Sequence, residues 1–245
     1  MLKVDLHLHT SDDPADVIAH DAHHLIDAAA IHGFDALAIT LHDRELSDPR
    51  TLDYARERGI TLLPGVERTI EGRHVLLINF REGTDQIRTF DELARRRSQG
   101  DGLVVAPHPF FPDSRCLRSH LDTHADSFDA VEWSYFWMRG LNFNARAARW
   151  AAERGKPLVG NSDLHDLRQL GRTYSIVFAE RTADAICSAI RDGRVSVHTS
   201  PVPALELTQV LSGMRRRGNK APVAVDTVAV APTEPPIIAG VTTRS

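Results

Sequence analysis

The sequence predicts an α/β barrel, and three observations carry this prediction. The chain has 245 residues, a length that one α/β barrel commonly fills. Short apolar runs alternate with helical stretches along most of it, which is typical of βαβ units around a parallel sheet. Hydrophobic residues make up 42% and charged residues 25%, so the composition is that of a globular protein able to bury a core.

Strands and helices are expected to alternate in the order set by these runs. The strands are expected at residues 3–9, 36–40, 60–66, 74–80, 103–107, 128–133, 157–160, 174–178 and 194–197. The helices are expected at residues 25–31, 51–58, 89–99, 143–154, 183–191 and 204–214. After this point periodicity is lost and prolines accumulate, so we expect one barrel domain over 1–214 and a disordered tail over 215–245.

The composition excludes several classes of protein. No apolar run approaches the ~18 residues of a membrane span. Met1 leads directly into a strand-like segment, so we expect no signal peptide. Only two cysteines, Cys116 and Cys187, argue against a disulfide scaffold and favour a reducing, cytoplasmic location. A net charge of −4 provides no basic footprint for duplex nucleic acid. The oligomeric state is not predicted.

Thirteen histidines stand out in a chain with only 3 Trp, 3 Tyr and 3 Met. In four places a helix ends at a glycine, which readily adopts the left-handed conformation there. A strand then follows, and it ends at a residue of a type that can bind a metal. These pairs, eight or nine residues apart, are Gly33 and His42, Gly59 and Glu67, Gly100 and His108, and Gly155 and Asp163. The four ligand-type residues are therefore expected at the C-terminal ends of parallel strands, the face of an α/β barrel that holds the active site.

Two pairs of potential ligands share a face of a strand. His7 and His9 are two residues apart, so both imidazoles point the same way, an arrangement that suits a divalent transition metal. Asp163 and His165 repeat the spacing with a carboxylate and an imidazole. His74 begins a further apolar strand. Each residue alone has an ordinary explanation, and their joint placement on one face favours a metal site.

These segments resemble the PHP (polymerase and histidinol phosphatase) family of metal-dependent phosphoesterases over about residues 3–197. The motifs that carry the resemblance are Val4-Asp5-Leu6-His7-Leu8-His9-Thr10, Leu37-Ala38-Ile39-Thr40-Leu41-His42-Asp43, Pro64-Gly65-Val66-Glu67, Ala106-Pro107-His108-Pro109 and Asn161-Ser162-Asp163-Leu164-His165. The resemblance implies a distorted, seven-stranded (β/α) barrel, similar to a TIM barrel. It also implies two or three divalent ions, and because the ligands are His and carboxylate, Zn, Mn and Fe all remain possible.

The resemblance further implies how the ligands are shared. The first ion would be held by His7, His9, Glu67 and Asp163; a second by His42, His165 and an aspartate; and a third by Glu67, His74 and His108. The aspartate comes from the segment 11–13, where Asp12 and Asp13 are both candidates and Asp13 lies closer to the usual spacing.

The second motif departs from the family pattern, because Leu41 stands where the family usually has an aspartate. The lost carboxylate would serve beside the metals or in proton transfer. Asp43 is the candidate catalytic residue to replace it, although on a strand its side chain points away from that of His42.

The expected function is hydrolysis of a small phosphate ester, a phosphomonoester or short phosphodiester, by metal-activated water. Three divalent ions facing about three carboxylates would leave a net positive site that suits a phosphate dianion. The motifs contain no clear Ser-His-Asp or Cys-His arrangement, which fits a water nucleophile. Arg68, Arg44 and Arg172 lie in or beside expected strand-end loops and are candidates for binding the substrate, with Arg68 the first choice.

Two other functions stay open. An open metal site on a barrel also serves hydrolysis of amides and other C–N bonds, and Leu41 is compatible with a metal-binding regulatory module of reduced catalysis. A short oligonucleotide also stays open as a substrate. Trp133, Tyr135, Phe136 and Trp137 follow the strand that ends near Glu132, where they form barrel core or a wall for a ring-bearing substrate.

Overall fold

Two five-stranded sheets form the centre of the computed structural model, which describes residues 1–100 and 102–218. In spatial order, the first sheet contains β10 (Val195–Thr199), β9 (Thr173–Val177), β1 (Leu2–Leu8), β2 (Ala36–Ile39) and β3 (Thr61–Leu63). The second contains β4 (Gly65–Ile70), β5 (Arg73–Ile78), β6 (Leu103–Ala106), β7 (Ala130–Ser134) and β8 (Leu158–Asn161).

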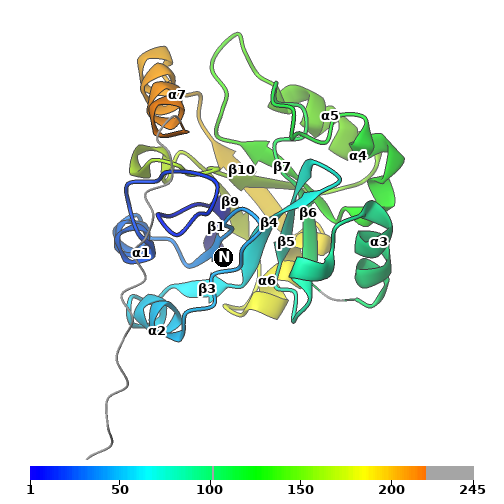
Figure 1. Ribbon diagram of the computed structural model, residues 1–245, viewed down its shortest axis with the longest axis horizontal. Helices are drawn as coiled ribbons and strands as arrows, with labels where there is room; N and C mark the ends of the chain where they lie inside the picture. Colours follow the sequence, from blue (N-terminus) through cyan, green and yellow to red (C-terminus); the bar gives the residue numbers. More distant parts are fainter. Residues whose placement is uncertain (101, 219–245) are drawn as a thin grey trace, which may run out of the picture.

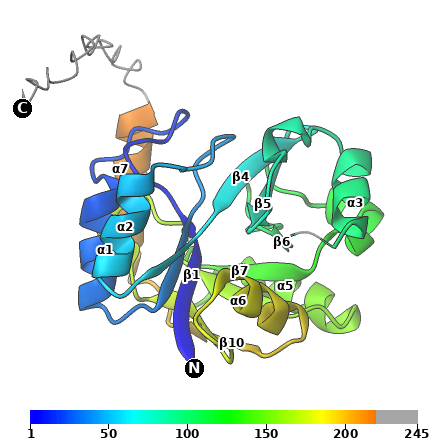
Figure 2. The same ribbon diagram turned by 90° about the horizontal axis from the view of Figure 1, so that it is seen from below.

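Helices flank the two sheets on their outer sides. They are α1 (Ala22–Ile31), α2 (Pro49–Glu57), α3 (Phe90–Ser98), α4 (His120–Thr123), α5 (Asn144–Glu153), α6 (Ala183–Arg191) and α7 (Ala204–Gly218). Three short 3-10 helices lie at Thr84–Gln86, Ala125–Ser127 and Leu167–Gln169. Both views show α1 and α2 on one side of the molecule and α3 and α5 on the other (Figures 1 and 2). The helices expected from the sequence are therefore present, and α1 begins earlier because the Asp21 side chain caps it by accepting from the N–H of His24.

The space between the sheets is filled with apolar side chains. Leu6 of β1, Leu76 of β5 and Val105 of β6 belong to one buried cluster. The inner face of α6, including Ile186 and Ile190, completes it. This packed interior holds the strands in place, and the candidate functional face lies at one end of them.

The chain changes sheets at Pro64. The single strand expected over 60–66 is divided there, because β3 pairs with β2 and β4 pairs with β5. Proline has no N–H to continue a ladder, and Gly65 admits close approach, since a Cβ there would lie 2.9 Å from the Thr40 methyl. Among the described residues no sheet closes, so the expected seven-stranded barrel is corrected to two sheets that face each other across seams.

Side chains replace main-chain pairing at the second seam, between β8 and the first sheet. The Asn161 Oδ1 atom accepts from the N–H of Leu6 at 2.9 Å, and the Ser175 hydroxyl bonds both the N–H and the carbonyl of Gly160. The buried Asp5 carboxylate accepts from the N–H of Ser162. The seam holds the end of β1 beside the residues that follow β8.

The expectation of a wholly parallel sheet is wrong at two places. The pairs β4–β5 and β5–β6 are antiparallel, and β9 is antiparallel to both of its neighbours. The tight turn at Glu71 and Gly72, both with positive φ, joins β4 to β5 as a hairpin, which leaves no room for a crossover helix.

At the C-terminal end, α7 extends to Gly218, whereas the sequence predicted a helix ending at residue 214. The predicted tail from residue 219 onward lies outside the described residues. Over the part of the chain that is described, none of the helices combines the length and apolar character needed to span a membrane.

Candidate metal centre

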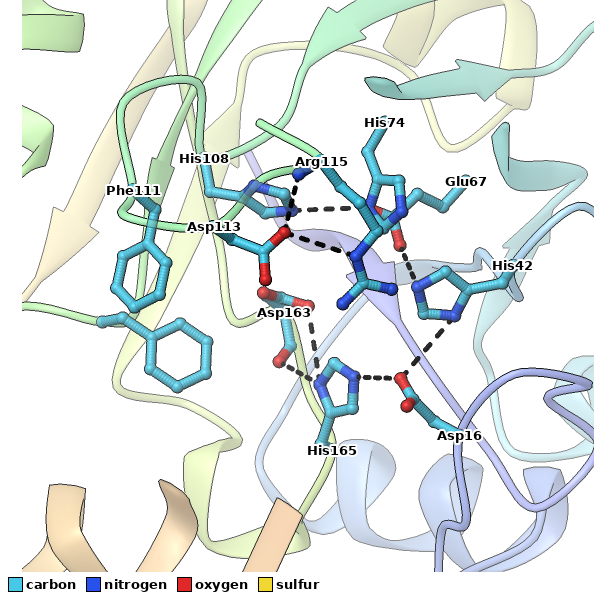
Figure 3. A pocket seen from close by; sticks show the side chains of 11 residues that line it. Asp16, His42, Glu67, His74, His108, Phe111, Asp113, Arg115, Asp163 and His165 are labelled. Carbon is cyan, nitrogen blue, oxygen red and sulfur yellow. Dashed lines mark hydrogen bonds and ion pairs between the residues drawn. The ribbon is translucent and has the colours of Figure 1, made fainter. Parts of the chain in front are cut away.

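Polar side chains converge where several strands end, although they come from distant parts of the sequence. The structure brings together there all nine residues expected to bind metal, and all of them are buried: His7, His9, Asp13, His42, Glu67, His74, His108, Asp163 and His165. A pocket of ≈ 270 Å³ opens over them. Its walls are formed by Asp16, His42, Glu67, His74, His108, Phe111, Asp113, Arg115, Phe136, Asp163 and His165 (Figure 3).

Four of these side chains point their ligand atoms at one another around a shared centre. The Nε2 atom of His7 lies 3.5 Å from Glu67 Oε2 and 3.4 Å from Asp163 Oδ1. The Nε2 atom of His9 lies 3.5 Å and 3.6 Å from the same two oxygens. Ligands about 2.1 Å from a tetrahedral ion lie about 3.4 Å from one another. The four atoms therefore have the spacing that a divalent ion requires.

The two Nε2 atoms are also unsatisfied. Both are fully buried, and neither has a hydrogen-bond partner among the described residues. A buried polar nitrogen without a partner is costly and calls for an explanation. An ion bound at this position would supply the missing partner for both His7 and His9.

The opposite ring nitrogens of these histidines are held by carboxylates. His7 Nδ1 donates to Glu132 Oε1 at 2.9 Å, and His9 Nδ1 donates to Asp13 Oδ2 at 2.8 Å. Glu132 also accepts from the N–H of His108 at 2.7 Å. Such contacts fix the tautomer that leaves Nε2 free to bind a metal, as in most metal sites built on histidine.

A second group of ligand atoms gathers around Glu67. Its Oε2 lies 3.1 Å from His42 Nε2, and its Oε1 lies 2.7 Å from His74 Nδ1 and 3.3 Å from His108 Nε2. His42, Glu67 and His74 form one of the compact groups able to hold an ion. Because Oε2 also faces His7 and His9, while Oε1 faces His74 and His108, this carboxylate can bridge two ions. On the far side of His108, the Cys116 Sγ lies 3.2 Å from Nδ1.

Asp16 is a pocket residue that sequence reasoning missed. Its Oδ2 lies 3.0 Å from His165 Nε2 and 3.7 Å from His42 Nδ1. Asp13 instead lies beneath the pocket, where its oxygens accept from His9 Nδ1, His42 Nδ1 and the N–H groups of Ala15 and Asp16. With His9 and His42, Asp13 also forms one of the compact groups able to hold an ion, so its expected place as a ligand stays a prediction. Asp16 is the loop carboxylate that lines the pocket.

The clustered charges shift the pKa values of the carboxylates. Burial alone would raise the pKa of Glu67, but the charge of His7 and other nearby imidazoles lowers it well below its usual range. Burial alone would also raise the pKa of Asp163, but the charge of His7 and contacts with other imidazoles outweigh this effect and lower it. Both carboxylates are therefore ionised and available to a cation near neutral pH.

Several imidazoles are shifted in the other direction. Burial lowers the pKa of His7 and His108, but the charges of Asp163 and Glu132 near His7, and the contacts of His108 with Cys116 and Glu67, outweigh it and raise both pKa values well above the usual one. Burial lowers the pKa of His42, but the hydrogen bond to Asp13 and the charges of Glu67, Asp13 and Asp16 outweigh it and raise the pKa to about 9. For His74, burial has the larger effect and its pKa is lowered.

The arginines expected to bind substrate do not line the pocket. Arg68 donates to the carbonyls of Asp85 and Ile87 and pairs with Asp43, and Arg44 donates to the Asp12 carbonyl. A further ion pair, 2.7 Å long, joins the guanidinium of Arg172 to Glu206. Arg115, which sequence reasoning did not consider, lines the pocket instead, and Figure 3 shows its guanidinium between His42 and Asp163.

Asp43 does not replace the carboxylate missing at position 41. Its φ of 52° turns its side chain toward β4, where Oδ1 accepts from the N–H of Thr69 at 2.7 Å and pairs with Arg68. Leu41 is fully buried in the apolar cluster beneath α1, so its side chain belongs to the core.

Comparisons with known proteins agree with this architecture. The family model described as PHP-associated matches residues 142–195, from the start of the α5 region to β10. No curated protein matches the sequence. A two-domain protein of Bacteroides vulgatus containing a predicted PHP-like metal-dependent phosphoesterase is similar with a TM-score of 0.59 at 20% identity, over 87% of this chain and 69% of that one.

Two further solved structures share the fold. PsfC from Pseudomonas syringae is similar with a TM-score of 0.59 at 18% identity, over 88% of this chain and 97% of that one. The lesion-specific endonuclease PfuEndoQ from Pyrococcus furiosus is similar with a TM-score of 0.55 at 19% identity, over 80% of this chain and 57% of that one. The chain thus shares the fold of a PHP-like protein, and its residues 142–195 match the PHP-associated family model.

Proposed function

We propose that this protein is a metal-dependent phosphoesterase that hydrolyses the phosphate ester of a small molecule. The observation that carries the proposal is the set of four buried ligand atoms from His7, His9, Glu67 and Asp163, two of them imidazole nitrogens without a partner among the described residues. A divalent ion bound there would lower the pKa of water and stabilise charge on the phosphate oxygens.

We assign the ligands in three groups. The first group is His7, His9, Glu67 and Asp163; the second is His42, Glu67, His74 and His108; and the third is His9, Asp163 and His165. Asp16 lies on the other side of the His165 ring, 3.0 Å from Nε2. Asp13 and Glu132 orient the histidines. Histidine and carboxylate ligands suit Zn, Mn and Fe.

Charge and size favour a small phosphate ester. Four carboxylates line the pocket, from Asp16, Glu67, Asp113 and Asp163, and Asp113 is paired with Arg115. Two or three divalent ions would outweigh the other three carboxylates and attract a phosphate dianion. Arg115 pairs with Asp113 through Nε, at 3.3 Å, and it is the guanidinium group in the pocket lining that could hold the phosphate as it binds. The volume of ≈ 270 Å³ lies below the usual range of roughly 300–1,000 Å³ for pockets that take drug-sized ligands.

A nucleic-acid phosphodiester is the competing substrate class, because a lesion-specific endonuclease shares the fold. The net charge of −4 and the small pocket favour the small molecule. Amide hydrolysis and regulatory metal binding without turnover are two further candidate functions, and one assay distinguishes them from phosphoester hydrolysis.

The test is turnover by the metal-loaded protein on p-nitrophenyl phosphate, bis(p-nitrophenyl) phosphate, an abasic-site duplex and p-nitroacetanilide, with metal content measured in parallel. We expect hydrolysis of the small phosphate esters, and loss of bound metal and activity in His7→Ala. His24→Ala is the matched control, since His24 is exposed on α1. Turnover of the anilide alone, or metal binding without any turnover, would refute the proposal.

A further inference from the structure

We propose that the pocket selects phosphate esters whose leaving group presents a flat apolar face, which packs against a wall formed by Phe111 and Phe136. This inference rests on the proposed function and specifies its substrate class. Within the described pocket lining, the wall is the one part that carries no polar group, whereas the remaining residues are acids, histidines and Arg115.

The two phenylalanines form one continuous surface. Their ring centroids are 5.6 Å apart, with planes inclined by 48°. Figure 3 shows Phe111 on the opposite side of the pocket from His42 and Glu67. A phosphate at the histidine and carboxylate cluster would therefore leave its ester substituent directed toward the rings.

The wall is held in place before any ligand binds. Phe136 is 6% exposed and packs with Tyr135, Val202 and Val210, which belong to β7 and its continuation and to the α7 region. Phe111 is only partly buried and is supported at its edge by Phe143, with centroids 5.4 Å apart. A preformed surface loses little conformational entropy on binding, so its apolar area contributes directly to affinity.

Helix α7 holds the residue next to Phe136 in place. Glu206 on α7 accepts from the Tyr135 hydroxyl at 2.8 Å and pairs with Arg172 at 2.7 Å. Arg172 thus acts on the pocket through α7, without contacting it. The ring surface is fixed by three parts of the chain: the loop after β6, the loop after β7, and α7.

The substituent that fits is a single flat ring. Part of the ≈ 270 Å³ volume is taken by the phosphate, which leaves room for little more than one ring. Burial of a ring of this size, with stacking on aromatic side chains, is worth on the order of tenfold to a hundredfold in binding. A polar substituent such as glycerol gains nothing from this wall.

The test compares benzyl phosphate with ethyl phosphate, because the two leaving alcohols have similar acidity and differ in apolar surface. For the metal-loaded protein we expect kcat/KM to be at least about tenfold higher for benzyl phosphate. In Phe111→Ala this ratio should fall toward one. Phe111→Leu, which keeps apolar bulk without a flat ring, should give an intermediate ratio. Phe178→Ala is the matched control, since Phe178 is 46% exposed and outside the pocket, and it should keep the ratio of the parent protein.

Binding of benzylphosphonate and ethylphosphonate, measured by calorimetry, distinguishes the role of the aromatic wall from the proposed phosphoesterase function. Equal kcat/KM for the two esters would overturn the inference and leave the phosphoesterase proposal standing. Preferential binding of benzylphosphonate without turnover of either ester would overturn the phosphoesterase proposal and support the wall. Equal binding of the phosphonates without turnover would overturn both.

Discussion

The main chain of Glu67 is paired with that of His42 across the seam between the two sheets. The N–H of Asp43 donates to the Glu67 carbonyl at 2.9 Å, and the N–H of Glu67 donates to the Leu41 carbonyl at 3.1 Å. This isolated bridge brings Glu67 Oε2 within 3.1 Å of His42 Nε2. The change of sheet at Pro64 thus places the Glu67 carboxylate where both ligand groups share it.

Replacement of Glu67 should weaken metal binding at both ligand groups at once. Glu67→Gln keeps the shape of the side chain but removes the negative charge that faces five imidazoles, so we expect loss of most bound metal and a fall in activity of at least about a hundredfold. Metal content by mass spectrometry measures this. Glu57→Gln, at an exposed position of α2, is the control. Retention of full metal content in Glu67→Gln would contradict the assignment.

Asp13 and Asp12 should differ sharply despite being neighbours. Asp13→Asn weakens the contacts that orient His9 and His42, and loss of such contacts typically costs about 10- to 100-fold in metal affinity. The Asp12 carboxylate makes a long contact with the Thr10 hydroxyl, at 3.4 Å, so Asp12→Asn should bind metal as the parent protein does. Equal loss in both variants would point to a ligand role for Asp12 as well.

Cys116 should support metal binding, and Cys187 should not. Both thiols are buried to a similar degree, so Cys116→Ala and Cys187→Ala remove comparable packing. Only Cys116 lies against a ligand histidine, at 3.2 Å from His108 Nδ1. We expect about tenfold weaker metal affinity in Cys116→Ala alone, with partial recovery in Cys116→Ser, whose hydroxyl can replace the contact. Identical affinities in the two alanine variants would remove Cys116 from this role.

Metal binding should strengthen as the pH rises toward 9. The pKa of His42 is raised to about 9 in the folded, metal-free protein, so a proton must leave this imidazole before a metal binds. Titration between about pH 6 and pH 9 should show affinity rising throughout, with a proton released on binding. In Asp13→Asn the pKa of His42 should fall, and the rise should end at lower pH. A flat profile in the parent protein would contradict this.

The same shift has a consequence for stability. Because the folded pKa of His42 lies above its unfolded value, its contribution to the stability of the metal-free protein is complete below about pH 6.5 and is lost as pH rises through about 9. Denaturant unfolding with a chelator present should therefore show a smaller free energy of unfolding near pH 9 than near neutrality. His42→Ala should show a smaller pH dependence than the parent protein over this interval.

The seam between β8 and β1 depends on one amide. Asn161→Ala would leave the buried N–H of Leu6 without its acceptor, at a cost of about 1–3 kcal/mol. The change also removes a donor to Glu132, so metal affinity should fall with stability. Denaturant unfolding measures the first effect and metal titration the second. Asn142→Ala, near the surface before α5, should change both by far less.

The sequence by itself determined the parts of the site that depend on local geometry. His7 and His9 share a face because the strand repeats every two residues, and the intervals from Gly33, Gly100 and Gly155 to their ligands are set by a helix end and one strand. Those relations are local in the sequence, and the structure gathers all the residues they indicated. The interval from Gly59 to Glu67 differs, because it contains the change of sheet at Pro64. The helices and most strands followed from periodicity for the same reason.

Only the tertiary structure decided which of several neighbouring residues reaches the pocket. Asp16 lines it whereas Asp13 accepts hydrogen bonds from His9 in its own loop and from the distant His42, and Arg115 lines it whereas Arg68 is held by carbonyls of a distant loop. The split of the expected strand at Pro64 depends on which partner each half finds. A loop side chain is directed by contacts with segments far away in the sequence, and no local period encodes those contacts.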